Sequence, residues 1–536
     1  MFAPPDSLDQ VMRLFKFLLG AALALSMFSC GGAGNHPAMP PPRIDTHECS
    51  TGNIQDYNQT LETLLSTVLL EYKPNQMTGT LVCHGTKIRF EGGHNQMAML
   101  NPTMFDDIQI IKKPEGGDQV KNLVRRDGLG VPVVMMQKFR KDKSSLTKLF
   151  PLNGRHLPAT LVAEPDDNGV LVFKFHHTRN VQNIAFHGKY HDLAYDLSTP
   201  LSRSMRGSLN GNMALNGLVD SDRYLGDTGI YVPDVYDPGK IPVVFVHGLK
   251  SDPHIWQNAM NEVLRDPELR KKYQCWYFLY PTGLPIYASA AKLRHMLNLA
   301  RDHYDPGHGN AQMNQIVLVG HSMGGIISRM QTIDSGMDIY DSCFVKPLAQ
   351  LPVEPLTKNL IRESMIFKRV PFVKRVIFVA TPHQGSSVAQ IPIVNLASLL
   401  VHPTRALDAV TLDIRLHAKD SVNPKLLTFR NFGACSTLTL SPDHPLLAAM
   451  QKRTIQVPYH SVIAAQHFDT DPTNTSDGIV AYWSSHISGA QSEKIVAGNH
   501  GCIRLPAVSE EILRILRLHC DTSAMAKRAT HHLSLE

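Results

Sequence analysis

Ser322 has the sequence context of a reactive serine. It stands in Gly320-His321-Ser322-Met323-Gly324, directly after the apolar run from Gln315 to Val319 and before a helix-like segment from Ile326 to Gln331. A serine on a tight turn between a strand and a helix is lifted clear of the sheet, and the flanking glycines leave room for that turn. The helix that follows points its N-terminus at developing negative charge. This context predicts a nucleophile, whereas the pentapeptide alone would be a weak signal.

A serine hydroxyl becomes a good nucleophile only when a base takes its proton. In folds that present a serine on such a turn, an acid and then a histidine follow it along the chain. His500 fits this order, because it lies in a loop of small residues between the strand-like run Glu493 to Ala497 and the last helix-like segment. His467 precedes the candidate acid and His486 precedes that last strand, so neither fits. We predict His500 as the base and His460 as a structural residue.

Three aspartates follow the penultimate strand-like run: Asp469, Asp471 and Asp477. Asp477 stands in Ser-Asp-Gly-Ile-Val, where the glycine permits a sharp turn and the apolar pair anchors the loop. Asp469 and Asp471 have the polar neighbours of a solvated loop. We predict Asp477 as the acid that orients His500 and stabilises its imidazolium.

Negative charge on the reacting carbonyl oxygen requires hydrogen-bond donors. The backbone N–H of Met323, the residue after the serine, is one candidate donor. The second is expected in the loop after an early strand, where Val243 to Val246 lead into His247-Gly248-Leu249. We predict the N–H of Leu249 as this donor. His247 itself is expected to be structural, because the position of the base is already filled.

The elements that must position these residues alternate between strands and helices in residues 238–520. We predict strands at Ile241 to His247, Cys275 to Tyr280, Gln315 to Val319, Arg375 to Ala380, Tyr459 to Ala465 and Glu493 to Ala497, and helices at Ala288 to Tyr304 and Glu510 to His519. This alternation predicts an α/β domain with a mostly parallel sheet and helices on both faces. Residues 44–237 are expected to form a mainly β accessory domain of unknown role. Its expected elements include a hairpin around His84-Gly85-Thr86, a strand from Val170 to Phe175, another strand pair around His187-Gly188 and a helix from Asn58 to Tyr72.

Proline and glycine mark the expected boundary between these two regions, at Asp234 to Lys240. Residues 521–536 are predicted as a C-terminal tail.

Four motifs together resemble the bacterial esterase/lipase branch of the α/β-hydrolases. They are Phe-Val-His-Gly-Leu, Gly-His-Ser-Met-Gly-Gly, Ala-Thr-Pro-His-Gln-Gly-Ser from Ala380 to Ser386, and Ser-Asp-Gly-Ile-Val. The resemblance covers Ile241 to His519. It implies an α/β-hydrolase fold, no cofactor, Ser322, Asp477 and His500 as catalytic residues, and ester substrates that include lipids as candidates.

The sequence departs from the family pattern at Gln384, where the family usually has arginine, which leaves the local contacts there open. By the same resemblance, residues 334–374 and 387–420 take the places of cap or lid elements. Val388 to Leu400 is apolar enough to line an acyl pocket and equally apolar enough to be ordinary core.

The first thirty residues have the pattern of an export signal. Arg13 and Lys16 precede an apolar run from Phe17 to Phe28, which ends in Ser29-Cys30-Gly31-Gly32. Translation that starts at Met12 instead of Met1 would give the signal a more usual charged N-terminal region. The end resembles a lipobox, which implies acylation of Cys30, attachment to a membrane at the outer membrane or cell surface, and a tether over residues 31–43. The alternative is a secreted or periplasmic protein with a chance cysteine at this position.

The composition and charge of the chain narrow the classes of function and partner that remain. The hydrophobic share of 43% and charged share of 19% are those of a globular protein, and a net charge of +6 without a dense Lys/Arg block gives no reason to expect nucleic acid as a partner. No His-Glu-x-x-His or Cys-x-x-Cys spacing is present, so no metal site is predicted.

Eight cysteines in an exported chain could form disulfides. Setting Cys30 aside leaves an odd number, so at least one is expected to be free. Cys502 with Cys520 and Cys49 with Cys83 are possible pairs, and free buried thiols are an equal alternative.

These features favour a serine hydrolase that cleaves carboxylic esters. Two other classes stay open. One is an acyltransferase or thioesterase on the same fold, which an assay with an alcohol or thiol acceptor would reveal. The other is a surface-binding lipoprotein that keeps the hydrolase scaffold without catalysis, which would bind equally well after substitution of Ser322.

Overall fold

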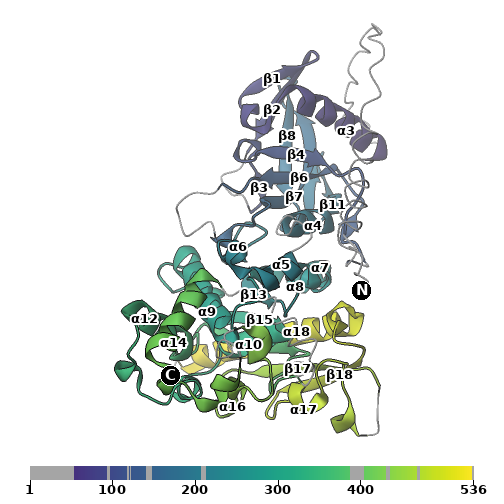
Figure 1. Ribbon diagram of the computed structural model, residues 1–536. Coiled ribbons are helices and arrows are strands. Elements are labelled where there is room, and N and C mark those ends of the chain that lie inside the picture. Colours follow the sequence, from purple (N-terminus) through teal and green to yellow (C-terminus); the bar gives the residue numbers. More distant parts are fainter. Residues whose placement is uncertain are drawn as a thin grey trace, which may run out of the picture. The chain divides into compact units, whose positions relative to one another are not determined.

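A computed structural model describes residues 54–533, except for 93–96, 117–119, 121, 141–147, 207–212, 387–403, 430–434 and 468–470. The described chain contains two large sheets (Figure 1), one in its N-terminal and one in its C-terminal half. The expected signal, tether, Cys30 and Cys49 lie outside the described residues, as does the segment Val388 to Leu400.

The N-terminal sheet is built from short strands in the order β1-β2-β8-β7-β6-β4, with β3 beside β8. Its strands are β1 (Thr80–Cys83), β2 (Thr86–Glu91), β3 (Met99–Leu100), β4 (Asp107–Ile110), β6 (Val131–Gln137), β7 (Arg155–Pro165) and β8 (Leu171–His177). Two ribbons pair β9 (Asn183–Phe186) with β10 (Lys189–Asp192) and β5 (Arg125–Arg126) with β11 (Tyr195–Asp196). Helix α3 (Ile54–Glu71) buries Leu61, Leu64 and Leu65 in one core with Phe173 and Phe175. The predicted hairpins, strand and helix of this region are confirmed.

The C-terminal sheet has the order β12-β14-β13-β15-β16-β17-β18. Its strands are β12 (Gly229–Tyr231), β13 (Ile241–Val246), β14 (Tyr273–Leu279), β15 (Ile316–His321), β16 (Val373–Val379), β17 (Tyr459–Ala465) and β18 (Ser492–Ala497). All pairs from β14 to β18 are parallel, and β12 alone pairs antiparallel, with β14. The mostly parallel α/β sheet is therefore confirmed. The three-residue edge strand β12 precedes the expected boundary at residue 237 and carries too short a pattern to be predicted.

Apolar cores cover both faces of this sheet. The helices are α4 (Ser198–Arg206), α5 (Met213–Val219), α6 (Ser221–Leu225), α7 (Gln257–Arg265), α8 (Pro267–Lys272), α9 (Ile286–Tyr304), α10 (Met323–Arg329), α11 (Asp338–Asp341), α12 (Pro355–Met365), α14 (Arg405–His417), α15 (Ser436–Thr439), α16 (Pro445–Gln451), α17 (Tyr482–Ser485) and α18 (Pro506–Leu533). Within β14, Trp276 and Phe278 join the core with α9 and α10, whereas Tyr277 and Leu279 join the core with α7 and α18. Burial on both faces explains why this strand reads as a continuous apolar run.

The segment Asp234 to Lys240 has no helix or strand, as its prolines and glycine indicate, but its first residue is firmly held. Asp234 is buried, with its carboxylate 2.6 Å from the Arg179 guanidinium and 3.2 Å from His177 Nε2. Lys240 donates a hydrogen bond to the Asn180 side chain at 2.7 Å. These contacts join the end of β8 and the residues after it to the start of the C-terminal sheet.

Among the described cysteines, Cys502 and Cys520 included, none forms a disulfide. Helix α18 contains the predicted helix Glu510 to His519 and continues to Leu533. Within the described residues, no helix combines the length and apolarity needed to cross a membrane.

Candidate active site

Ser322 occupies the turn between β15 and α10. The strand ends at His321 and the helix begins at Met323, so Ser322 is the single residue between them. Its backbone has φ 53° and ψ −126°, a conformation that a residue with a side chain adopts only under strain. Ser322 is only 7% exposed. The predicted strand, turn and helix around this serine are confirmed.

The two glycines of the pentapeptide are explained by close backbone contacts. A Cβ atom on Gly320 would lie 2.5 Å from the carbonyl oxygen of Gly324, and one on Gly324 would collide with the carbonyl oxygens of Val246 and His247. Only glycine therefore lets α10 pack this closely on β15 and β13. The same packing brings the end of β13 beside the serine.

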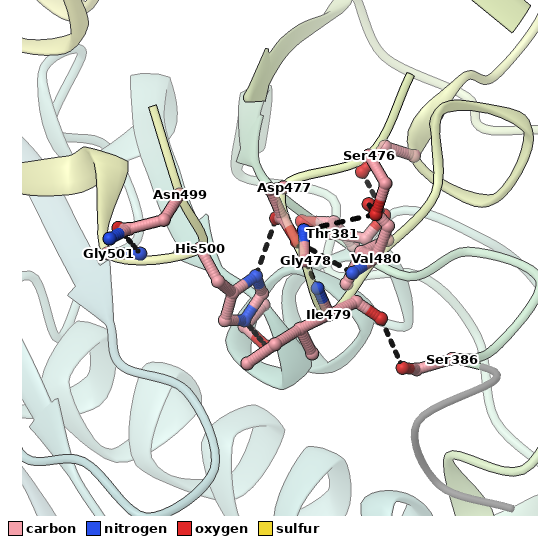
Figure 2. Close-up of polar contacts among 12 residues, drawn as sticks. Thr381, Ser386, Ser476, Asp477, Gly478, Ile479, Val480, Asn499, His500 and Gly501 are labelled. Carbon is pink, nitrogen blue, oxygen red and sulfur yellow. Dashed lines mark hydrogen bonds and ion pairs between the residues drawn. The ribbon is translucent and has the colours of Figure 1, made fainter. Parts of the chain in front are cut away.

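The fold brings the three predicted side chains together. His500 Nε2 lies 2.9 Å from Ser322 Oγ, and His500 Nδ1 lies 2.7 Å from Asp477 Oδ2. His500 follows β18 and Asp477 follows β17, so both come from loops after neighbouring parallel strands. Figure 2 shows the dashed contact between the His500 ring and Asp477. The ring lies between the hydroxyl and the carboxylate.

Asp477 is fixed by the backbone of its own loop. Its Oδ1 accepts hydrogen bonds from the N–H groups of Ile479 at 2.8 Å and Val480 at 2.7 Å (Figure 2), and the residue is only 2% exposed. The N–H of His500 donates to the backbone carbonyl of Asp477 at 3.0 Å. Because one carboxylate oxygen is held by the loop, the other is left to accept from His500 Nδ1. The opposite nitrogen, Nε2, can then accept the serine proton.

His321, the residue before the serine, holds the backbone of His500 in place, a role that the sequence did not predict. Its Nε2 donates to the backbone carbonyl of His500 at 2.9 Å, and the two rings lie with their centroids 5.0 Å apart. Burial, with the adjacent His500 ring, lowers the pKa of His321 to about 3. His321 is therefore a neutral donor at neutral pH. The only sequence signal is its place in the pentapeptide.

The loop after β13 approaches the serine as predicted. A Cβ atom on Gly248 would lie 2.9 Å from Ser322 Cβ, which shows how near this backbone comes. The Leu249 side chain packs against Leu218 and Cys435. In the described part of the chain, the N–H groups of Leu249 and Met323 have no hydrogen-bond acceptor.

His247 has the structural role that the sequence predicts. Its ring stacks on Tyr280 at 4.4 Å, its Nδ1 lies 3.1 Å from the carbonyl of Gly248, and burial lowers its pKa to about 4.

The rival candidates have other partners. His486 Nδ1 lies 2.8 Å from Glu493, and His460 bonds Ser492 and the buried Arg375 guanidinium. Asp471 is exposed and accepts hydrogen bonds from Thr473 within its own loop. Asp469 lies outside the described residues.

The Thr-Pro-His-Gln segment forms part of the wall beside Asp477. Gln384 donates from its side chain to the carbonyl of Trp483 at 2.7 Å, and Ser386 Oγ donates to the carbonyl of Ile479 at 2.5 Å (Figure 2). Gln384 therefore has a partner within this wall.

One group of possible metal ligands appears among the described residues, although spacing along the sequence predicted none. Atoms of Glu71, Cys83 and His84, at the end of α3 and the β1–β2 turn, lie within 4.8 Å of one another. His84 and Glu71 already form an ion pair at 2.8 Å. These residues belong to the N-terminal sheet region, and none of them contacts Ser322, Asp477 or His500.

No protein-family model matches this chain, and no curated protein matches its sequence. Among solved structures, the chain is similar to the mature lipase BlEst2 of Bacillus licheniformis, at 16% identity over 52% of this chain and 93% of that chain, with a TM-score of 0.31. It is also similar to Staphylococcus hyicus lipase, at 14% identity over 55% and 97% of the two chains, with a TM-score of 0.32. Esterase B from Lactobacillus rhamnosis matches at 12% identity over 56% and 81%, with a TM-score of 0.32. These neighbours are bacterial lipases and esterases, at scores too low to assign the activity of this chain.

Proposed function

We propose that this protein is a serine hydrolase of the α/β-hydrolase class that cleaves carboxylic esters. The observation that carries the proposal is the position of His500 between Ser322 Oγ, at 2.9 Å, and the Asp477 carboxylate, at 2.7 Å. The strand order of the C-terminal sheet and the strained turn at Ser322 support the proposed fold class.

In the proposed reaction, Ser322 Oγ attacks the ester carbonyl carbon while its proton passes to His500 Nε2. Asp477 stabilises the resulting imidazolium. The tetrahedral intermediate then collapses, and His500 donates the proton to the departing alcohol. A water molecule, deprotonated by His500, attacks the acyl group on Ser322 and releases the acid, which restores the hydroxyl.

The backbone N–H groups of Leu249 and Met323 are the proposed donors to the oxyanion. Both have no acceptor in the described part of the chain, and both belong to segments that contact the serine turn. Donors already fixed before the reaction stabilise developing charge without reorganising. The N-terminus of α10 adds the favourable end of its dipole.

Hydrolysis of a series of p-nitrophenyl esters from acetate to palmitate tests this proposal. We expect release of p-nitrophenol by the wild-type protein and loss of at least about 10⁴-fold in kcat for Ser322→Ala. Ser66→Ala, which removes a serine hydroxyl from α3, is the control and should retain full activity. A folded wild-type protein that cleaves none of these esters would refute the proposal.

We also propose export of the protein as a lipoprotein acylated on Cys30, and an accessory role for residues 44–237. The signal pattern over residues 1–30 supports the first part. Metabolic labelling with a radioactive fatty acid should mark the wild-type protein and not Cys30→Ser. Equal labelling of both would exclude Cys30 as the acylated residue.

A further inference from the structure

A second hollow lies in the C-terminal half, apart from the serine. It is a cavity of about 250 Å³, partly open to solvent, between α9, α12, α14 and the 3-10 turn Pro424–Thr428. Among the described residues, its lining includes neither Ser322, Asp477 and His500 nor the proposed oxyanion donors. The cavity is therefore a separate structural feature of this half.

The wall of the cavity is mainly apolar. Phe344, Ile361, Met365, Ile414 and Leu426 are among the side chains that line it. Cavities of about 150 Å³ with such walls take up benzene or xenon in place of water. A volume of about 250 Å³ leaves room for a longer aliphatic molecule.

Polar side chains interrupt this wall at several points, among them the buried residues Thr404, Thr411 and His444. His444 lines the cavity and is only 1% exposed. Its Nδ1 accepts the backbone N–H of Leu446 at 3.2 Å. The hydrogen of the neutral ring must therefore be on Nε2, and among the described residues this atom has no hydrogen-bond partner. Burial lowers the pKa of His444 to about 4, which keeps the ring neutral at physiological pH.

The charge of the lining narrows the class of ligand further. Lys292 is the one charged side chain among the described lining residues. A cationic amine would meet an apolar wall, a donor N–H and a like charge. A carboxylate would lose its hydration against the wall and gain little from Lys292, because that side chain is exposed to solvent. A neutral molecule with an acceptor oxygen would satisfy His444 Nε2 and bury its chain against the wall.

We propose that this cavity is a binding site for a neutral, medium-length aliphatic molecule that carries one hydrogen-bond-accepting oxygen. The His444 Nε2–H group donates to that oxygen, and the side chains from α9, α12 and α14 enclose the chain. The site does not depend on the proposed function, because its ligand is bound without any contribution from Ser322.

Isothermal titration calorimetry with 2-nonanone tests this proposal, since a ketone has an acceptor oxygen and cannot be hydrolysed. We expect saturable binding with the same Kd in wild type and in Ser322→Ala. His444→Phe keeps a ring of similar size and removes the donor, so it should weaken binding about five- to tenfold.

A matched pair on α14 locates the site. Val410→Trp places an indole in the cavity and should abolish binding, whereas Leu412→Trp, two residues along on the exposed face of the helix, should leave Kd unchanged. Unchanged circular dichroism and melting temperature show that each variant is folded. Three results would each overturn the proposal: no binding to wild type, equal binding to Val410→Trp, or loss of binding in Ser322→Ala. The last would place the ketone at the serine instead.

Discussion

At the scale of single residues, the proposed chemistry depends on which nitrogen of His500 carries the proton. Asp477 determines this, because one of its oxygens is occupied by the N–H groups of Ile479 and Val480 and the other faces His500 Nδ1. Nε2 is thereby kept free to accept the proton of Ser322. The acid therefore acts by orientation and charge, and it does not need to take up a proton itself.

Asp477→Asn tests this role. The amide keeps the size of the carboxylate but allows the wrong tautomer of His500, so kcat for a p-nitrophenyl ester should fall about 10⁴-fold. A cooperative urea unfolding transition should show that the Asp477→Asn variant is folded. Asp471→Asn, in the exposed part of the same connection, should behave as wild type. If Asp477→Asn keeps more than a tenth of the wild-type kcat, another group orients the base.

At the scale of secondary-structure elements, the serine turn depends on the contact of α10 with β13 and β15. Gly324→Ala would force a methyl group into the carbonyls of Val246 and His247. We expect the free energy of unfolding to fall by about 1–3 kcal/mol and ester hydrolysis to be lost with the turn geometry. Gly307→Ala is the matched control, because a Cβ atom there meets nothing within 4 Å. Urea titration measures the free energy of unfolding of both variants, and equal stability of Gly324→Ala and Gly307→Ala would contradict this explanation.

The sequence predicted the parallel strands and the three clustered side chains well, because each depends on local patterns. The apolar runs at β13 and β15 are continuous because both faces are buried, and the order serine, acid, histidine follows from the order of the strands. The contribution of His321 was missed because its ring contacts the backbone carbonyl of His500, and no side-chain motif marks such a contact. His444 Nε2, which has no partner among the described residues, was missed because the cavity is formed by helices that are separate in the sequence. Three-residue strand β12 has too short a pattern to detect.

At the scale of the whole molecule, a buried ion pair connects the two halves of the described chain. Burial alone would raise the pKa of Asp234, but Arg179 and His177 lower it below its ordinary value. Asp234→Asn would leave Arg179 buried without its counter-charge and should lower the free energy of unfolding by about 3–5 kcal/mol. Asp127→Asn removes an exposed partner of Arg125 and should change it by less than about 0.5 kcal/mol. A loss for Asp234→Asn no greater than that control would show that the pair contributes little.

Buried neutral histidines predict a decline in stability in mild acid. Burial lowers the pKa values of His247 and His444 to about 4. It lowers those of His321, beside His500, and His460, beside Arg375, to about 3. In the unfolded chain a histidine titrates near 6.5. Above that pH these groups are neutral in both states, and the stability they contribute is complete. As the pH falls from about 6.5 towards 4, the unfolded chain takes up protons that the folded chain cannot, so the folded state loses stability.

Urea unfolding at pH 7.5 and pH 5 measures this effect. The free energy of unfolding should be lower at pH 5 by on the order of several kcal/mol, since each such histidine contributes about 2 kcal/mol at that pH. Equal or greater stability at pH 5 would mean that these rings gain protons freely in the folded protein.

The most direct test of the central claim is covalent labelling with diethyl p-nitrophenyl phosphate, followed by peptide mass spectrometry. A serine activated by His500 attacks phosphorus, p-nitrophenolate leaves, and a diethylphosphoryl group remains on the serine oxygen. We expect one such group per chain, on Ser322, and none on Ser322→Ala or His500→Gln. Labelling of a different residue, or ester hydrolysis that continues while Ser322 stays unmodified, would contradict the assignment of Ser322 as the nucleophile.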